Sequence, residues 1–364
     1  MIVKMGYMLQ KEERRMGGGN VSQDQTSIIC IDLKSFYASV ECVERGLDPF
    51  KANLVVADPT RSKSTICLAI TPAMKSLGIK NRCRIHEIPD CVKYITAMPR
   101  MQLYMDYSAK IYGIYLRYVS KEDIHVYSVD ECFIDVTNYL QLYHLTAKEM
   151  AVKLMQEVME ETGITATAGV GTNLYLAKIA MDIVAKHVDD HIGILDEFSY
   201  REQLWDHKPL SDFWRIGSRT EKKLAGYGIH TMGDIAMASL RSEDWLYKMF
   251  GIDAELLIDH AWGYETCRMS DIKNYHSEEH SLSNGQVLMR NYSFEEALVI
   301  VREMTDNLVL ELFEKGLVTS SITLWIAYDH RYEHEASKGT VKLERGSNSS
   351  KKIMDAVEDL YLRI

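Results

Sequence analysis

The order of apolar and polar residues predicts an α+β fold in which helices cover one face of an antiparallel or mixed sheet. Two observations carry this prediction. Short β-branched or small-residue runs alternate with stretches of helical apolar spacing between residues 27 and 187, and a second alternation begins near residue 276. At 364 residues the chain is also longer than one hydrophobic core usually organises, so we expect two to four domains.

The composition is that of an ordinary globular protein. We find no signal peptide and no apolar run of the roughly 18 residues that cross a bilayer, so we expect a cytoplasmic protein without a membrane partner. The seven cysteines show no C-x-x-C spacing, which favours reduced and mostly buried thiols. The net charge of -10 argues weakly against nucleic acid, although a carboxylate site for metal ions adds negative charge by itself.

Structure is expected to begin near Ser27, after a flexible leader over residues 1–26 that contains three consecutive glycines. A β-branched run from Ile28 ends at Asp32, and "SFYASVECVERG" follows with helical spacing, which predicts a strand, a tight turn and a helix. "NLVVAD" and "STICLAIT" are predicted strands. "PAMKSLGI" is a predicted helix with proline at its first position.

The next segment contains one long predicted helix, Met101–Val119, and then a hairpin, "VYSVDECFIDVT", with Asp130 and Glu131 at its turn. The helix "AKEMAVKLMQEVMEETG", the strand "ITATAGVG" and the helix "NLYLAKIAMDIVAKH" follow, the last capped by Asn173.

After residue 187 the pattern changes. "LSDFWRIGSRTEKKLAGYGIHTMGDIA" predicts two short helices about a glycine turn, "WLYKMFGIDAELLIDHAWG" adds further helix, and the polar "YETCRMSDIKNY" is a predicted linker. From His276 we expect a compact β-α-β-β-α unit. Its elements are "HSLSNGQVL", "SFEEALVIVREMTDNLVLELFEKG", "SSITLWIAY", "TVKLE" and a final helix.

Asp32, Asp130 and Glu131 would crowd negative charge together if their strands were adjacent, which is costly unless cations bind there. Oxygen ligands of this kind suit Mg²⁺ or Mn²⁺, and a pair of such ions supports nucleotidyl transfer. Taken alone, an acidic pair at a hairpin turn is more often a solvated turn. The combination of the two sites with nearby cations favours the metal site. These cations are Lys75, Lys178 and Lys186.

The turn after Asp32 leaves backbone N–H groups free at a helix start, which suits an anion such as a triphosphate. Phe36 and Tyr37 follow in the first turn of that helix. Adjacent helical residues are about 100° apart, so one ring can face the core while the other faces the carboxylates.

"CIDLKSFYASVE", "YSVDECFIDVT" and "AGVGTNLYLAKIAMD" resemble, in this order, the palm motifs of the Y-family translesion DNA polymerases. "CVERGLDP" and "LAITPAMKSLGIKNRCRIHEIP" resemble the UmuC-like branch of Gram-positive bacteria and their mobile elements. The resemblance implies a right-hand polymerase. Its parts would be a ferredoxin-like palm (27–41 and 101–188), small fingers (42–100), a helical thumb with a helix-hairpin-helix (189–263), a linker (264–276) and a little finger (277–364).

By the same resemblance, two Mg²⁺ ions, with Mn²⁺ as a substitute, would bind Asp32, Asp130 and Glu131, with Leu33 contributing its backbone carbonyl. These three carboxylates would be the catalytic residues.

The resemblance also assigns the nucleotide site. Tyr37 would be the steric gate that blocks a ribose 2′-OH, with Phe36 beside it. Lys186 would contact the triphosphate, and so would Lys75, which stands where many members have arginine.

Contacts to DNA are implied in two regions. "FWRIGSRTEKKLAGYGI" resembles the helix-hairpin-helix of the thumb, in which Ile216 and Gly217 would offer backbone N–H groups to a phosphate. Trp214 and Arg215 stand where proline and glycine are frequent in the family. In the little finger the candidate contacts are Arg290, Arg331 and Lys342. The chain stops in what would be the last helix of that unit, so we expect the last strand and a clamp-binding tail to be missing.

The function implied is template-directed synthesis across damaged bases, error-prone and of the SOS type, with pyrophosphate release. Primer-template DNA and dNTP would be the partners, together with a sliding clamp or SOS accessory proteins. Two alternatives remain open at this point: another two-metal nucleotide enzyme such as a cyclase, and a DNA-binding or regulatory relative that has lost catalysis.

Overall fold

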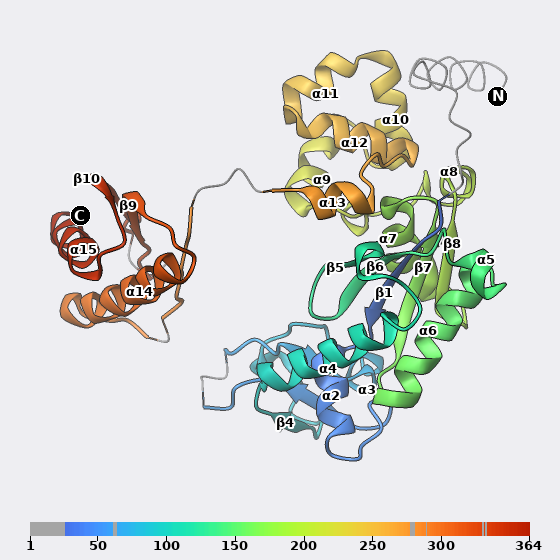
Figure 1. Ribbon diagram of the computed structural model, residues 1–364, viewed down its shortest axis with the longest axis horizontal. Helices are drawn as coiled ribbons and strands as arrows, with labels where there is room; N and C mark the ends of the chain where they lie inside the picture. Colours follow the sequence, from blue (N-terminus) through green and yellow to red (C-terminus); the bar gives the residue numbers. More distant parts are fainter. Residues whose placement is uncertain (1–25, 61–63, 277–280, 289, 330, 332) are drawn as a thin grey trace. The chain divides into compact units, whose positions relative to one another are not determined.

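The computed structural model describes residues 26–60, 64–276, 281–288, 290–329, 331 and 333–364. The expected leader, apart from Thr26, therefore lies outside the described residues. The chain divides into two compact units, one ending at Tyr275 and the other spanning His276–Ile364 (Figure 1). The further division of the first unit into palm, fingers and thumb stays a prediction.

A five-stranded sheet in the order β5-β6-β1-β7-β8 forms the centre of the first unit. β1 lies in the middle, pairs antiparallel with β6 and β7, and is almost completely buried. The strands are β1 (Ile28–Leu33), β5 (Ile124–Val126), β6 (Glu131–Asp135), β7 (Ala166–Gly171) and β8 (Ile192–Leu195). The predicted strand, hairpin and small-residue strand are thus confirmed.

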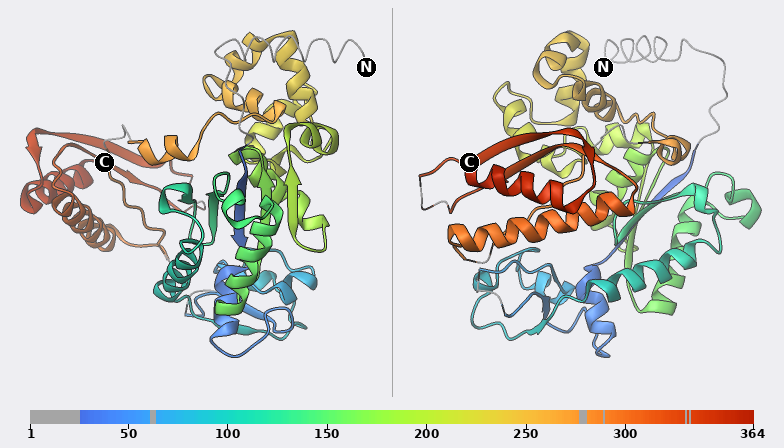
Figure 2. Two further views of the ribbon diagram at one scale, coloured as in Figure 1. Left: turned by 45° about the vertical axis from the view of Figure 1, so that its right-hand side comes forward. Right: turned by 60° about the vertical axis from the view of Figure 1, so that its left-hand side comes forward.

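Helices cover both faces of this sheet, so the prediction of one covered face is wrong (Figures 1 and 2). Ile29 and Ile31 face a core shared with α4 (Met101–Tyr115) and α6 (Ala147–Thr162). The alternate residues of β1 face α7 (Leu174–Asp182). The cause lies in β7, where a Cβ added at Gly169 or Gly171 would come within 2.1 or 2.2 Å of the α7 backbone. Only a strand with glycine at these positions lets a helix approach so closely.

The start of α7 agrees with the sequence prediction, but its end does not. Asn173 caps the start as expected, because its side chain accepts a hydrogen bond from the N–H of Leu176 at 2.8 Å. The helix ends at Asp182 instead of continuing, and a 3-10 turn, η3 (Val184–His187), follows. Here the chain crosses β8 closely, since a Cβ at Gly193 would lie 2.1 Å from the carbonyl of Ala180.

A small three-stranded sheet in the order β3-β2-β4 packs against α2 (Phe36–Val43). It contains β2 (Leu54–Val56), β3 (Ala69–Ile70) and β4 (Ile95–Ala97). The helix α3 (Pro72–Ser76) and the 3-10 turn η1 (Ile85–Glu87) lie between β3 and β4 in the sequence. The predicted strand "STICLAIT" is reduced to two residues and an isolated bridge between Ile66 and Arg84. Pro72 opens α3, as the sequence predicts, and Thr71 caps it.

The remaining helices of the first unit pack around a separate core. They are α8 (Glu197–Leu204), η4 (Leu210–Asp212), α9 (Ser218–Ala225), α10 (Met232–Arg241), α11 (Glu243–Phe250) and α12 (Asp253–Trp262). Two further short elements, η2 (Lys121–Asp123) and α5 (Leu140–Tyr143), lie between α4 and α6 in the sequence. The segment expected to be a linker contains α13 (Met269–Asn274). Met269 is buried with Phe133 against the sheet, so most of this segment belongs to the first unit.

The second unit packs α14 (Phe294–Glu314) and α15 (Ser350–Arg363) on the hairpin of β9 (Thr319–Ile326) and β10 (Ser337–Ser347). The prediction of a first strand in a β-α-β-β-α unit is wrong for residues 281–288, because these residues form no strand. Within the described part of this unit, β9 and β10 pair only with each other. The Asn284-Gly285 pair also interrupts the alternation there, and a strand without a partner is not stable.

Among the described residues no helix is long and apolar enough to cross a membrane. All seven cysteines are free thiols, as expected, and five of them are buried. The buried five are Cys30, Cys42, Cys67, Cys83 and Cys132.

Candidate active site

Strand pairing brings the three predicted catalytic carboxylates together. Asp32, near the end of β1, is the cross-strand partner of Glu131, the first residue of β6. The N–H of Leu33 donates a hydrogen bond to the carbonyl of Asp130 at 2.8 Å, which fixes the turn beside the end of β1. The register of one antiparallel pair therefore decides that these groups share one edge of the sheet.

The negative charge of the Asp32 carboxylate is only partly neutralised by positively charged side chains of the protein. Burial first, and then the charges of Asp130 and Glu131, raise the pKa of Asp32 to about 7, against the opposing effect of Lys178. Burial also raises the pKa of Glu131, against the effect of Lys178. Repulsion of this kind is relieved when a divalent cation binds.

Lys178 is the strongest partner of this cluster. From α7, its Nζ lies 2.8 Å from Oε1 of Glu131 and 3.1 Å from Oδ2 of Asp182, and the side chain is only 10% exposed. Burial lowers the pKa of Lys178, but the charges of Asp182, Cys30 and Glu131 raise it to a net value above normal. Lys178 is therefore charged at neutral pH and holds Glu131 in place.

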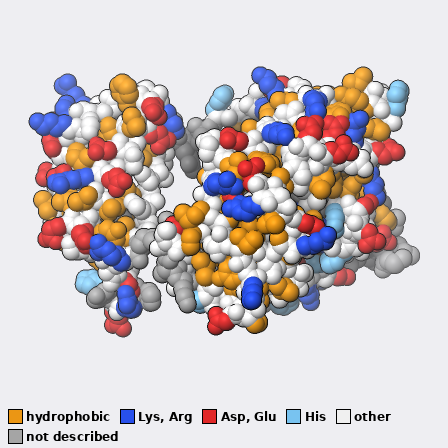
Figure 3. All heavy atoms as spheres, turned by 90° about the horizontal axis from the view of Figure 1, so that it is seen from below, with side chains coloured by type: hydrophobic (Ala, Val, Ile, Leu, Met, Phe, Trp, Pro, Cys, Tyr) orange, Lys and Arg blue, Asp and Glu red, His pale blue; other side chains and the backbone are white. Residues whose placement is uncertain are grey.

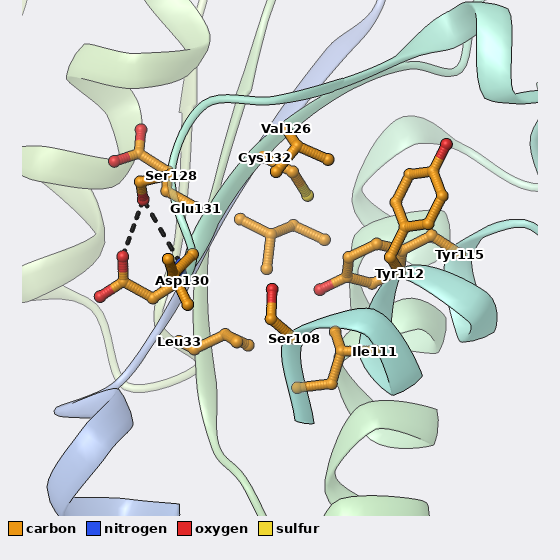
Figure 4. A pocket seen from close by; sticks show the side chains of 12 residues that line it. Leu33, Ser108, Ile111, Tyr112, Tyr115, Val126, Ser128, Asp130, Glu131 and Cys132 are labelled. Carbon is orange, nitrogen blue, oxygen red and sulfur yellow. Dashed lines mark hydrogen bonds between the residues drawn. The ribbon is translucent and has the colours of Figure 1, made fainter. Parts of the chain in front are cut away.

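Asp130 is oriented by its own turn. The hydroxyl of Ser128 donates to Oδ1 of Asp130 at 2.7 Å. Beside them, a cleft opens between the β5-β6 hairpin and α4, and Figure 4 shows Ser108 and Tyr112 of α4 on its far side.

The donor set fits hard divalent cations, because it consists of carboxylate oxygens and the backbone carbonyl of Leu33. In the part of the chain that the structure describes, no three His, Cys, Asp or Glu side chains converge on one point. The reason is local: Glu131 is turned to Lys178 and Asp130 is bonded to Ser128. Asp32 and Asp130 are thus the residues suited to hold a cation directly, and Glu131 would add to them by rotating away from Lys178.

The two aromatic residues at the start of α2 separate as predicted. Phe36 is 2% exposed and belongs to the core, whereas Tyr37 is partly exposed. Burial raises the pKa of Tyr37, the charge of Asp130 adds to this, and the charge of Arg82 opposes it. The ring of Tyr37 stacks on that of Tyr104.

The predicted phosphate-binding lysines Lys75 and Lys186 interact through their charges. Burial lowers the pKa of Lys75, the charge of Asp32 opposes this, and the charge of Lys186 adds to it. Burial and then the charge of Lys75 lower the pKa of Lys34. Lys34 was not among the predicted contacts, although its place directly after Leu33 at the turn is a signal that could have identified it.

The glycine turn of the predicted helix-hairpin-helix precedes α9. Ile216 is buried, and Gly217 is exposed at the N-terminus of the helix. The φ of Gly217 is -89°, and a Cβ added there would meet nothing within 4 Å. Glycine at this position is therefore not required by the fold itself. Arg215 has a φ of 67°, which turns the chain before the helix.

Trp214 links this turn to the β5-β6 hairpin that carries Asp130 and Glu131, which we call the carboxylate hairpin. The sequence predicts no role for Trp214. Its Nε1 donates to the hydroxyl of Tyr127 at 3.1 Å, and its ring lies 5.9 Å from those of Tyr127 and Phe133. Nζ of Lys178 in turn lies 5.9 Å from the ring centroid of Tyr127.

In the second unit, two of the predicted DNA contacts are engaged within the protein. Arg290 binds the carboxylate of Glu296 with hydrogen bonds of 3.0 and 2.6 Å, and Arg331 binds Asp329 at 3.0 and 2.7 Å. Lys342, in contrast, is exposed on β10.

Lys338 and Lys342 alternate with residues that face α14 and α15, and Lys338 is the cross-strand partner of the exposed Trp325. This sheet face is the more suitable one for a phosphate backbone. On the face of the molecule in Figure 3, basic side chains are interspersed with acidic ones, so local groups rather than net charge would have to bind DNA.

Comparison with known proteins gives matches over nearly the whole described chain. Residues 31–182 match the impB/mucB/samB family, and residues 279–364 match the C-terminal domain of that family. UvrX of Bacillus subtilis (strain 168), a protein named for UV-damage repair, is 32% identical over 83% of this chain and 70% of its own length. "DNA polymerase IV 2" of the same organism is 29% identical over 92% of this chain and 80% of its own length.

Solved structures agree on the fold. The chain titled "Y-family DNA polymerase chimera Dbh-Dpo4(243-245)-Dbh" superposes with a TM-score of 0.68 at 23% identity, over 93% of this chain and 94% of the other. A "Dbh Ternary Complex" superposes with a TM-score of 0.56 at 22% identity and the same coverage. The expected polymerase fold is thereby confirmed.

Proposed function

Because this chain belongs to the impB/mucB/samB family of Y-family DNA polymerases, we propose that it adds deoxynucleotides to a DNA primer opposite damaged template bases. The observation that carries the proposal is the register that pairs Asp32 with Glu131 and sets Asp130 at the adjoining turn. The names of the relatives, which refer to UV-damage repair and to DNA polymerase IV, support synthesis in response to damage.

In the reaction, the primer 3′-hydroxyl attacks the α-phosphorus of the nucleotide, a new P–O bond forms, and the bond to the leaving pyrophosphate breaks. Asp32, Asp130 and the carbonyl of Leu33 would bind two Mg²⁺ ions, with Mn²⁺ able to replace them. When bound, such ions lower the pKa of the attacking hydroxyl and neutralise charge on the leaving oxygens. Glu131 stays close by through its ion pair with Lys178.

The nucleotide is held by cations and selected by an aromatic ring. Lys75 and Lys186 would bind the triphosphate, and Lys34, whose pKa the charge of Lys75 lowers, is a further candidate for this contact. Tyr37 would exclude a ribose 2′-hydroxyl by contact, while Phe36 stays in the core and supports the helix.

DNA would be held by contacts that do not depend on sequence, as a polymerase requires. The N–H of Gly217, next to the N-terminus of α9, suits one phosphate, whereas the N–H of Ile216 already donates to the carbonyl of Phe213 at 3.1 Å. In the second unit Lys338 and Lys342 suit others, while Arg290 and Arg331 would have to leave their carboxylate partners. Binding of this kind weakens steeply as salt rises.

The alternatives can now be weighed. Family membership removes a nucleotide cyclase from consideration, because the match includes the C-terminal domain that a cyclase would not need. The other alternative, a DNA-binding or regulatory relative that has lost catalysis, is distinguished from an active polymerase by the following experiment.

The test is extension of a labelled primer opposite an abasic site with Mg²⁺, by the wild type and by the double variant Asp130→Ala and Glu131→Ala. We expect extension only by the wild type. If the wild type does not extend, or the double variant extends equally well, the proposed function is wrong.

A further inference from the structure

The ring of Tyr37 is backed by a second aromatic ring. The centroids of Tyr37 and Tyr104 are 4.5 Å apart, and the ring planes differ by 14°. Tyr104 belongs to α4 and is fully buried, whereas Tyr37 is partly exposed in the first turn of α2. Movement of the Tyr37 ring towards α4 is therefore blocked by a side chain that cannot move into solvent.

Tyr104 is itself fixed by a buried carboxylate. Its hydroxyl donates to Oε1 of Glu41 at 2.8 Å, and the side chain of Glu41 is 0% exposed. Arg100 donates to both oxygens of Glu41, at 2.9 and 2.8 Å, and Arg45 binds the same carboxylate. Bidentate, charge-assisted pairs of this kind are strong and have a defined geometry.

The protonation states fix the direction of the hydrogen bond. Burial raises the pKa of Glu41, but hydrogen bonds from Arg100, Tyr104 and Arg45 lower it to a net value below normal. Burial and the bond to Glu41 raise the pKa of Tyr104. At neutral pH the carboxylate is ionised and the phenol keeps its proton. Rotation of Tyr104 would leave a buried charge short of one donor, which is costly.

We propose that Glu41 and Tyr104 are positioning residues for sugar selection, holding the ring of Tyr37 where it meets a ribose 2′-hydroxyl. The inference rests on the proposed function, because it assigns a role within the nucleotide site. Exclusion by contact depends on the position of the excluding ring, and displacements of about 1 Å change rates strongly at such sites. Loss of the backing ring therefore reduces discrimination between deoxynucleotides and ribonucleotides.

A purely structural role, in which the network only joins α2 to α4, predicts a different outcome. The chain offers a matched control for it. Tyr107, also on α4, donates to Glu44 at the end of α2 at 2.8 Å, and among the described residues it makes no ring contact with Tyr37. Tyr104→Phe and Tyr107→Phe each remove one Tyr–Glu bond between the same two helices. Only the first touches the network behind Tyr37.

The experiment measures kcat/KM for one dNTP and for the matching rNTP, and compares their ratio among the wild type, Tyr37→Ala, Tyr104→Leu, Tyr104→Phe, Glu41→Gln and Tyr107→Phe. We expect Tyr104→Leu to lower the dNTP-over-rNTP ratio about tenfold, which corresponds to about 1.4 kcal/mol of differential stabilisation. Tyr104→Phe and Glu41→Gln lower it less, Tyr37→Ala lowers it most, and Tyr107→Phe leaves it unchanged.

The outcomes separate the two proposals. If the wild type incorporates no dNTP, the proposed function fails and this inference with it. A wild-type ratio in Tyr104→Leu, with Tyr37→Ala altered, overturns the positioning role and leaves the proposed function intact. Should Tyr104→Leu fail to fold, wild-type ratios in both Tyr104→Phe and Glu41→Gln overturn it. A ratio lowered equally by Tyr107→Phe would show a structural effect and overturn it as well.

Discussion

Lys178 and Glu131 form a nearly buried ion pair, 2.8 Å apart, between helix α7 and the carboxylate hairpin. The two side chains are 10% and 9% exposed, so neither charge is well solvated without the other. This relationship joins the face of the sheet covered by α7 to the edge where the carboxylates of Asp32, Asp130 and Glu131 lie.

Replacing Lys178 with Met leaves Glu131 buried without its main partner. We expect the free energy of unfolding to fall by about 3 kcal/mol, as is usual when one member of a buried pair is removed. Lys148→Met is the control, because Lys148 pairs with Asp190 at 2.7 Å with both side chains 45% exposed, and there we expect a loss below about 1 kcal/mol. Equal losses in thermal or urea unfolding would contradict the account of Lys178.

The contact between Trp214 and Tyr127 connects the glycine turn of α9 with the carboxylate hairpin across 87 positions of the sequence. Trp214→Phe keeps a ring but removes the N–H donor, and Tyr127→Phe removes the acceptor. A double-mutant cycle in urea unfolding should give a coupling energy of about 0.5 to 1 kcal/mol. A coupling of zero would mean that the hydrogen bond contributes nothing to joining these segments.

Gly217 distinguishes a requirement of the fold from a requirement of DNA binding. A Cβ at this position meets nothing within 4 Å and its φ of -89° suits any residue, so Gly217→Ala should lower the unfolding free energy by no more than about 1 kcal/mol, the cost of alanine at a helix N-cap. If a phosphate lies against this turn, the affinity for primer-template DNA should fall about five- to tenfold. Unchanged affinity, measured by fluorescence anisotropy at fixed salt, would place the phosphate elsewhere.

The carboxylate of Glu41 makes stability depend on acid pH. Its folded pKa is lowered, so its stabilising effect is complete above the unfolded pKa of about 4.3 and is lost as pH falls through the folded value. The difference in melting temperature between wild type and Glu41→Gln should therefore be largest above about pH 5 and shrink on acidification. A difference that stays constant between neutral and acid pH would contradict this linkage.

The sequence pattern predicts much of the region around the five-stranded sheet, because local signals there agree with the final structure. The β-branched run of β1, the spacing in α2 and the capping Asn173 of α7 are all local. That Asp32, Asp130 and Glu131 lie at one edge of the sheet could also be expected, since each lies at or next to the end of an apolar strand.

Other features depend on packing between distant segments and leave little trace in a local pattern. The second covered face of the sheet follows from Gly169 and Gly171, whose meaning appears only when α7 is placed against them. The partner of Lys178 depends on the same placement. Tyr104 shows only that it lies on the apolar side of its helix, and its contact with Tyr37 requires the packing of α2 on α4.

The most direct measurement of the central claim is incorporation of a single dNTP into an undamaged primer-template with Mg²⁺, by the wild type and by Asp32→Asn. The account predicts addition of one templated nucleotide by the wild type. It also predicts a rate lower by about a hundredfold or more in the variant, because the charge that holds the ions is lost. Incorporation at equal rates by both proteins, or by neither, would contradict it.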